Sequence, residues 1–262
     1  MKLIKVPFSG NNPNNKDCDK APDTIIKELE EVYASEDNKL VHPKLFNVES
    51  IPMNDDWELT KESIIEFISQ NDDFPICLGG DHSITYPLFK AFAQKFKNPG
   101  LIVFDAHPDT YTEEDYSYFH GGWLKFLVEE NIAKPENIIV IGIRNPDPDE
   151  IIYMKKKKIT FYTMKQIFEN NVKDVCDMVM EKARKFENLY ISLDIDSVDP
   201  AFAPGTGCIE PGGLASRELI YFIQRLKLLK NLRMMDIVEV NPKIDVNNMT
   251  SKLASKVIGE FF

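Results

Sequence analysis

The sequence predicts an α/β fold in which helices cover both faces of a mostly parallel sheet. Short runs rich in β-branched and aromatic residues alternate with longer segments whose apolar residues recur at helical spacing. Several of the short runs are apolar at consecutive positions, which is typical of strands buried on both faces. This alternation favours a three-layer α/β/α architecture, and 262 residues are enough for one such unit. We therefore expect a single domain spanning residues 1–262.

Eight runs are predicted as strands, so the sheet should contain about eight strands. In chain order they occupy residues 2–8, 44–48, 74–80, 101–107, 137–143, 159–162, 189–195 and 232–240. Helices are predicted at residues 22–34, 60–69, 84–96 and 171–186, where apolar side chains follow helical periodicity. The basic run at 155–158 lies between apolar segments and is interpreted as a solvated helix end.

The acidic composition narrows the range of partners. The chain has 31 Lys and Arg against 42 Asp and Glu, a formal net charge of -11, whereas nucleic-acid binding requires a basic patch. This charge suits a small cationic substrate instead. The first residues lack the apolar stretch of a signal peptide, and no uncharged run of about 18 apolar residues occurs. We expect a soluble cytoplasmic protein that binds neither nucleic acid nor membranes.

The four cysteines are Cys18, Cys77, Cys176 and Cys208, and they form no Cys-x-x-Cys pair. Their spacing indicates neither a zinc knuckle nor a disulfide framework. Reduced thiols are the simplest interpretation, in agreement with a cytoplasmic location.

Side chains that commonly bind metals follow four of the predicted strands. In chain order they are His82, Asp105, His107, Asp109, Asp194, Asp196 and Glu239. In open α/β sheets the active crevice lies beyond the carboxyl ends of the strands. We therefore expect these side chains to converge on one site at that edge of the sheet.

The chemistry of this set indicates a pair of metal ions. Carboxylates are seldom fully buried unless they are paired or bind a cation. Two histidines with four aspartates carry too much negative charge for one small site, and two divalent ions would balance it. Oxygen and imidazole ligands without a thiolate favour manganese over a structural zinc. Two such ions can activate water at neutral pH, which predicts a hydrolase.

Each motif also has a simpler interpretation when it is taken alone. "GGDHS" at 79–83 is compatible with a glycine turn and a helix N-cap, and the aspartates of "DIDSVD" at 194–199 are compatible with turns or caps. "DAHPD" at 105–109 is more specific for metal. A dinuclear metallophosphoesterase would need additional Gly-Asp and Gly-Asn-His motifs, a related deacetylase would use one metal, and a non-catalytic relative would lack a ligand or Glu239. Together the three motifs favour a dinuclear enzyme.

The ordered motifs resemble those of the ureohydrolase family, the arginases and agmatinases. They are Gly-Gly-Asp81-His82-Ser83, Asp105-Ala-His107-Pro-Asp109, His120-Gly, Ser192-Leu-Asp194-Ile-Asp196-x-x-Asp199-Pro and Asp236-Ile-Val-Glu239-Val-Asn-Pro. The likeness covers nearly the whole chain, because residues 6–29 resemble the opening segment of the family and residues 204–214 a later loop. The resemblance implies an arginase-like fold and assembly as a trimer or hexamer.

The resemblance also implies roles for individual residues. His82 and Asp109 would bind one manganese, His107 and Asp196 the other, and Asp105 with Asp194 would bridge both. Asp81 is expected to cap a helix or to support a ligand, and Asp199 to stabilise the turn before Pro200. Glu239 would hold the substrate guanidinium, which stays charged and needs an anionic partner in a desolvated site.

The implied reaction is attack of water on the guanidino carbon, followed by release of urea and an amine. An amine leaves slowly without a proton, so a general acid is needed. His120 is the candidate within "FHGGW", and it joins Asp109 and Glu239 as a predicted catalytic residue. Taken alone, His120 would be interpreted as a surface loop histidine. Trp123 stands where the family has Pro, so a different shape is possible for this loop.

The identity of the guanidine is less determined by the sequence. Asp147 matches an arginase aspartate that receives the α-amino group, although capping of a helix explains it equally well. Tyr111 and Thr206 are further candidate substrate contacts. Acidic residues at Glu113, Glu114 and Asp115 would repel a free α-carboxylate if they faced the pocket. Arginine and agmatine are about equally favoured as substrates, with a slight preference for a substrate that lacks a free α-carboxylate, such as peptide-bound arginine. Formiminoglutamate is disfavoured.

Overall fold

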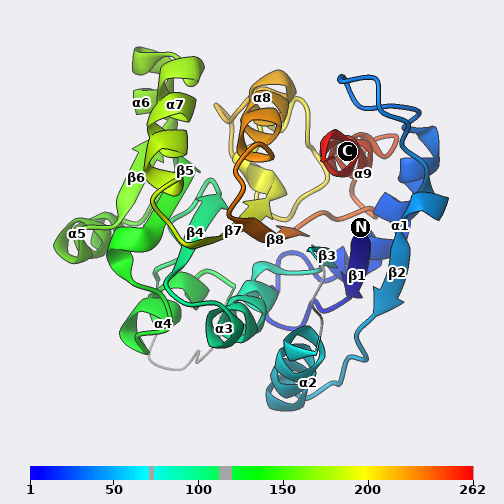
Figure 1. The fold of residues 1–262 in the computed structure, drawn as a ribbon, viewed down its shortest axis with the longest axis horizontal. Coiled ribbons are helices and arrows are strands. Elements are labelled where there is room, and N and C mark those ends of the chain that lie inside the picture. Colours follow the sequence, from blue (N-terminus) through cyan, green and yellow to red (C-terminus); the bar gives the residue numbers. More distant parts are fainter. Residues whose placement is uncertain (71–73, 112–119, 262) are drawn as a thin grey trace.

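The computed structural model describes residues 1–70, 74–111 and 120–261. Within these ranges the chain forms an eight-stranded sheet in which all neighbouring strands are parallel (Figure 1). The strands are β1 Lys2–Val6, β2 Asn47–Ser50, β3 Pro75–Gly79, β4 Pro99–Phe104, β5 Ile138–Ile143, β6 Thr160–Thr163, β7 Asn188–Asp194 and β8 Leu232–Val238. All eight predicted strands are confirmed. The second begins later than expected, because a 3-10 helix at Pro43–Leu45 precedes it.

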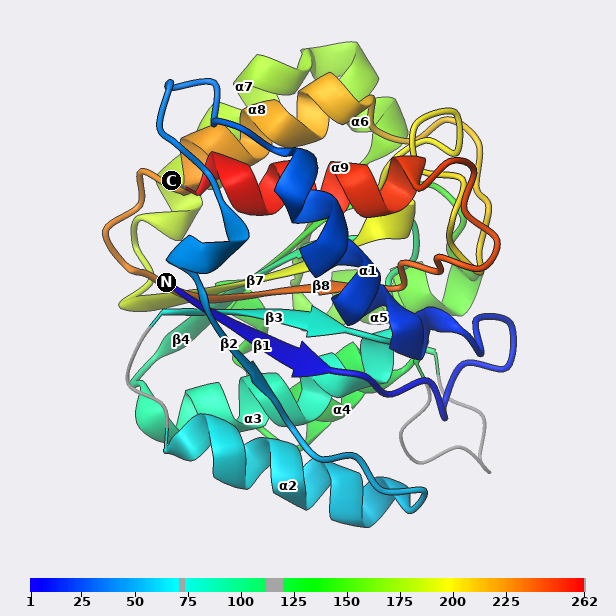
Figure 2. The same ribbon diagram turned by 90° about the vertical axis from the view of Figure 1, so that its right-hand side faces the viewer.

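Helices lie on both faces of the sheet, which confirms the predicted α/β/α layers. One face is covered by α1 Ala21–Glu28, α6 Met164–Asn170, α7 Val172–Ala183, α8 Ser216–Leu226 and α9 Met249–Glu260. The other is covered by α2 Trp57–Ser69, α3 Thr85–Lys95, α4 Trp123–Glu129 and α5 Pro148–Lys157. Figure 2 shows the sheet edge-on between these layers. None of the helices in the described ranges combines the length and apolar character that a transmembrane span requires.

The four predicted helices are present, but the one expected at 22–34 is shorter. Its α-helical part ends at Glu28, and a 3-10 turn at Leu29–Glu31 follows. Helices α4, α6, α8 and α9 are absent from the prediction. The lysines at 155–158 do form the end of a helix, with Lys158 in the left-handed conformation that terminates α5.

The consecutive apolar residues of the central strands are explained by burial on both faces. In β4, Ile102 and Phe104 pack with one helical layer, while Leu101 and Val103 pack with the other. Successive side chains of a strand point to opposite faces, so both sets of positions in β4 are apolar. This is why the pattern of unbroken apolar runs predicts a covered, parallel sheet.

The strand order brings the predicted site residues together. The order is β2-β1-β3-β8-β7-β4-β5-β6, so the four strands that precede the candidate ligands are neighbours in the middle of the sheet. Their carboxyl ends meet at one edge, where the segments after β1, β7 and β8 also gather (Figure 2). The direction in which consecutive strands are added to the sheet changes in this region, and ligands in open α/β sheets bind at such a switch point.

Candidate metal centre

His82 lies at the buried end of the site, among three carboxylates. Its Nδ1 atom is 3.2 Å from Asp105 Oδ2, 3.0 Å from Asp109 Oδ2 and 3.1 Å from Asp194 Oδ2. The histidine follows β3, in a 3-10 turn whose N-cap is Asp81, as expected for that aspartate. One ring nitrogen carries at most one proton, so it cannot donate to three oxygens. The three carboxylates carry more negative charge than one imidazole can balance, which favours a bound cation.

A buried network determines which nitrogen of His82 faces the carboxylates. His82 Nε2 lies 3.0 Å from Ser192 Oγ, and that hydroxyl donates to Asp236 Oδ1 at 2.7 Å. Because the serine proton is used by Asp236, the hydroxyl oxygen accepts from an Nε2–H group. In the neutral ring, Nδ1 then presents a lone pair to the centre, which is the orientation of a metal ligand.

The aspartates are oriented by backbone N–H groups. Asp105 Oδ1 accepts from His107 N at 2.7 Å, Asp194 Oδ1 accepts from Asp196 N at 2.8 Å, and Asp196 Oδ1 accepts from Ala106 N at 3.0 Å. In each case the second oxygen is 3.1–3.2 Å from a histidine Nδ1 atom. One oxygen thus fixes the side chain and the other faces the centre.

Trp123 encloses the His82 half of the centre. Its indole Nε1 donates to Asp109 Oδ2 at 2.7 Å, and its fully buried ring lies 4.7 Å from the His82 ring, centroid to centroid. The residue is the first of α4, a helix position that also suits Pro. Tyr111 N donates to Gly121 O at 3.0 Å, so the chain on either side of residues 112–119 is paired. Trp123, at the position where Pro was expected, thus supplies an additional hydrogen-bond donor to the candidate ligand Asp109.

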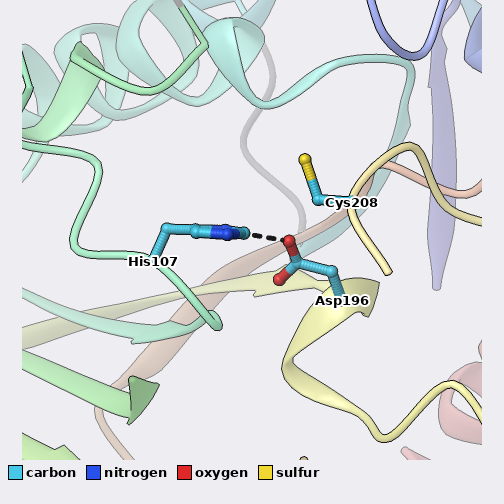
Figure 3. A group of neighbouring side chains, drawn as sticks. All are labelled: His107, Asp196 and Cys208. Atoms are coloured by element: carbon cyan, nitrogen blue, oxygen red, sulfur yellow. Dashed lines mark ion pairs between the residues drawn. The ribbon is translucent and has the colours of Figure 1, made fainter. Parts of the chain in front are cut away.

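The His107 half is more open and contains a thiol (Figure 3). His107 Nδ1 lies 3.1 Å from Asp196 Oδ2 and 3.5 Å from Asp105 Oδ1, and the His107 side chain is 22% exposed. Its Nε2 atom lies 3.7 Å from Glu210 Oε1. Donor atoms of His107, Asp196 and Cys208 all lie within 4.8 Å of one another. The spacing of the cysteines in the sequence does not predict this position of Cys208, which the fold brings beside His107 and Asp196.

The electrostatics of the centre fit bound cations. Burial raises the pKa of Asp105 to about 6, and burial together with Asp196 raises the pKa of Asp194. Burial alone would lower the pKa of His82, but its three carboxylate neighbours outweigh this and raise it. Within the described residues, His82 Nδ1 and Asp105 Oδ2 are buried without a hydrogen-bond partner. Buried charge of this kind is stabilised by a metal ion, so the residues present fit one.

Glu239 is held at the end of β8 in an unusual backbone conformation. Its Oε1 accepts from His82 N at 2.8 Å, while Oε2 accepts from Asn12 Nδ2 at 2.9 Å and Asn15 Nδ2 at 2.7 Å. The φ angle of +64° is costly for a Glu residue, and such strain is common at functional sites. Burial raises the pKa of Glu239 to about 7.

His120 is oriented by the segment that follows β1. Its Nδ1 atom lies 2.9 Å from Asn11 O, and a carbonyl oxygen only accepts, so Nδ1 carries a proton. His120 also lines the pocket above the centre.

The centre forms the floor of a pocket of about 450 Å³. Its walls include the predicted contacts Tyr111, Asp147 and Thr206 together with His120 and Glu239. The Thr206 side chain is buried, and its Oγ1 has no hydrogen-bond partner among the described residues. All predicted site residues within the described ranges therefore meet at one place, whereas the acidic residues at 113–115 lie outside those ranges.

Comparisons with known proteins agree with this geometry. The sequence profile of the arginase family matches residues 1–262. The chain belongs to the arginase family. An arginase from Staphylococcus aureus is 37% identical over 207 residues, covering 74% of this chain and 68% of that protein. A formimidoylglutamase from Halalkalibacterium halodurans is 33% identical over 270 residues, covering 98% of this chain and 84% of that protein.

Solved structures of arginase-family proteins share the fold of this chain. Proclavaminate amidino hydrolase from Streptomyces clavuligerus superposes with a TM-score of 0.91 at 28% identity, covering 99% of this chain and 89% of that one. Arginase from Bacillus subtilis superposes with a TM-score of 0.87 at 26% identity, covering 100% and 97%. The predicted arginase-like fold and family are both confirmed.

Sequence reasoning about this arginase-family chain missed several supporting residues. Asn12 and Asn15 hold Glu239 from more than 220 positions away, and the motif order contains no signal for that contact. Arg144 Nη2 donates to Asp196 O at 2.6 Å and to Glu210 O at 2.7 Å, which ties the loop after β7 to residues 204–214. The expected turn at Asp199 is present, since its carboxylate accepts from Ala201 N, Gly212 N and Gly213 N.

Asp147 caps a helix and also lines the pocket, the two roles between which the sequence could not decide. Its carboxylate accepts from Asp149 N at 2.8 Å, and it forms a capping box with Glu150 at the start of α5. The same residue also lines the pocket. Capping therefore does not exclude contact with a ligand.

Proposed function

We propose that this chain hydrolyses a guanidino C–N bond of a small cationic substrate and releases urea and an amine. The observation that carries the proposal is the convergence of two histidines and four aspartates at the floor of the pocket, where each aspartate has an oxygen within 3.2 Å of a histidine Nδ1 atom. Membership of the arginase family supports the same class of reaction. A metallophosphoesterase is disfavoured because, among the described residues, the pocket is lined by the further acids Asp147, Glu150 and Glu239 and by no Lys or Arg that could bind phosphate.

We assign two manganese ions to this centre. His82 and Asp109 would hold one, His107 and Asp196 the other, and Asp105 with Asp194 would bridge them. Support comes from Asp105, which contacts both histidines at 3.2 and 3.5 Å. When bound, the two cations would supply the charge that activates water as a nucleophile near neutral pH.

Glu239 would bind and orient the guanidinium group. Three N–H donors occupy most of the roughly four lone-pair positions of this carboxylate, and the remaining position is available to a substrate N–H. Its pKa, raised by burial, returns toward ordinary values when a cation binds beside it. A guanidinium therefore both needs this carboxylate and keeps it ionised.

His120 would give a proton to the departing amine. Asn11 O fixes the proton on Nδ1, so Nε2 is the atom that exchanges protons on the pocket side. Without this transfer the leaving group would depart as an unstable amide anion. Asp109 would contribute to catalysis as a ligand of the metal at the enclosed half, and Trp123 Nε1 donates to its carboxylate.

The tail of the substrate is the least constrained part of the proposal. Asp147, Tyr111 and Thr206 lie on the pocket wall, where they can contact it. The relatives carry the names arginase, formimidoylglutamase, proclavaminate amidino hydrolase and agmatine ureohydrolase. We keep arginine, agmatine and peptide-bound arginine as candidates, and the formimidoylglutamase relatives make an N-formimidoyl amino acid the second candidate. We also propose a single cytoplasmic domain that assembles as a trimer or hexamer.

The test is product release by manganese-loaded protein from a panel of amidines. The panel contains arginine, agmatine, shorter guanidino acids, an arginine-containing peptide and an N-formimidoyl amino acid. Urea from one guanidine is the expected result, whereas formamide from the last compound would select the second candidate. No product from any member, with two metals bound per chain, would contradict the proposed reaction.

A further inference from the structure

Cys208 differs from the other three cysteines in its surroundings. Cys18, Cys77 and Cys176 are buried, whereas Cys208 is partly exposed and lines the pocket. Donor atoms of Cys208, His107 and Asp196 lie within 4.8 Å of one another. Figure 3 shows these three side chains, which come from separate segments after β4 and β7. A thiol therefore stands beside two candidate metal ligands on the open side of the centre.

We propose that His107, Asp196 and Cys208 form a site for a thiophilic divalent cation such as Zn²⁺, with the Cys208 sulfur as the third ligand. This inference rests on the proposed function in one respect, the use of His107 and Asp196 as metal ligands. It adds a ligand that the manganese assignment does not use, and it predicts which metals compete at this half of the centre.

The ligand types are those that zinc prefers. Zinc is bound in proteins by thiolate, imidazole and carboxylate groups, and three protein ligands leave a fourth position open. Zinc–ligand distances of about 2.0–2.3 Å place neighbouring donors about 3.5 Å apart. The His107 and Asp196 donors are already 3.1 Å apart, and the donors that lie as far as 4.8 Å apart would have to approach by about an ångström. On binding, the S–H bond of Cys208 is replaced by an S–Zn bond and the proton passes to water, with no change of oxidation state.

The same ligands discriminate against manganese. Manganese prefers oxygen ligands, and its affinity for a given nitrogen, oxygen or sulfur site is below that of zinc. The Cys208 thiolate increases the difference in affinity between zinc and manganese at the His107 half only. The neighbours of His82 are Trp123, Ser192 and carboxylates, which supply no thiolate. Zinc should therefore displace manganese most readily from the open half and block the pocket, whereas the enclosed half, which has no thiolate ligand, should discriminate less strongly between the two metals.

The experiment uses Co²⁺ as a spectroscopic substitute for Zn²⁺ and does not depend on turnover. Metal-free protein titrated with Co²⁺ should develop a near-ultraviolet thiolate-to-cobalt charge-transfer band, which added Zn²⁺ should remove. Cys208→Ser should lose the band and bind Zn²⁺ at least about tenfold more weakly, while its Mn²⁺ affinity changes by less than about threefold. Cys176→Ser, altered at a buried thiol on α7, is the matched control and should keep the band.

The outcomes separate this inference from the proposed function. Absence of the band while Co²⁺ is bound, or its persistence in both Cys208→Ser and Cys208→Ala, would overturn the thiolate site. Circular dichroism and thermal melts show whether either variant has lost its fold. Two different replacements are made so that a folded protein without the Cys208 thiol is obtained even if one of them unfolds. A further outcome is that the unaltered protein shows the band and both Cys208 variants lose it while no amidine reacts. That result would contradict the proposed reaction and would still support the thiolate site.

Discussion

The two halves of the candidate metal centre are built differently. The His82 side chain is 1% exposed and is enclosed by the Trp123 ring, the Ser192 hydroxyl and three carboxylates, whereas the His107 side chain is 22% exposed beside Cys208 and Glu210. The enclosed half has its ligands fixed by further hydrogen bonds. In the open half, Glu210 Oε1 lies 3.7 Å from the outer nitrogen of His107, beyond hydrogen-bonding distance.

This difference indicates a division of roles between the halves. Partners that fix the orientation of a ligand increase metal affinity, typically by about 10- to 100-fold. The enclosed half is therefore expected to retain its cation, while the open half exchanges its cation and faces the substrate. Substitutions at three positions test this comparison, in order of decreasing expected effect.

The largest effect is expected from Asp196→Ala. The variant should bind one manganese per chain instead of two and lose nearly all turnover, because a ligand of the open half is removed while the enclosed half is untouched. Metal content measured by elemental analysis gives the stoichiometry. Glu210→Gln, altered beside the centre but outside the proposed ligand set, should keep both ions. Two ions in Asp196→Ala would show that the ligands are wrongly assigned.

A smaller effect is expected from Trp123→Phe. The variant keeps a ring against His82 but removes the indole donor to Asp109, a hydrogen bond to a charged group worth about 1.5–3 kcal/mol. Manganese affinity of the enclosed half should fall about 10- to 100-fold, while the open half changes little. Titration followed by electron paramagnetic resonance of free Mn²⁺ measures both affinities.

The control for this variant is Trp57→Phe, which changes a tryptophan on α2 that packs against Phe8. It should leave both manganese affinities unchanged. Equal weakening of the two halves in Trp123→Phe would contradict the comparison, since the indole contacts only the enclosed one among the described residues.

The smallest effect is expected at Asp147, which serves both α5 and the open side of the pocket. Asp147→Ala should lower the free energy of unfolding by about 1 kcal/mol through loss of the N-cap, whereas Asp147→Ser should preserve it. Both variants should raise KM about two- to fivefold for a substrate with an amino group at its tail, because an exposed charge pair is lost. An unchanged KM in both would leave capping as the only role of Asp147.

Much of the fold and of the site follows from local sequence patterns. Unbroken apolar runs are required wherever a strand is covered on both faces, so the eight strands were predictable from short windows. The candidate ligands were predictable because they directly follow such runs, and parallel strands end at a common edge. The end of α1 was not, since the last turn of a helix depends on packing against the sheet as well as on sequence. Helix α8 was missed although its apolar residues recur at helical spacing and Glu218 caps its start.

The sequence by itself determined the layered architecture, the set of two histidines and four aspartates, and the family. Only the tertiary structure decided how those ligands are supported. Asn12 reaches Glu239 across 227 positions, Trp123 replaces an expected Pro yet donates to Asp109, and Cys208 stands beside His107. These contacts join segments that have no shared periodicity or motif. They exist because the strand order β3-β8-β7-β4 places the loops of distant segments over one edge of the sheet.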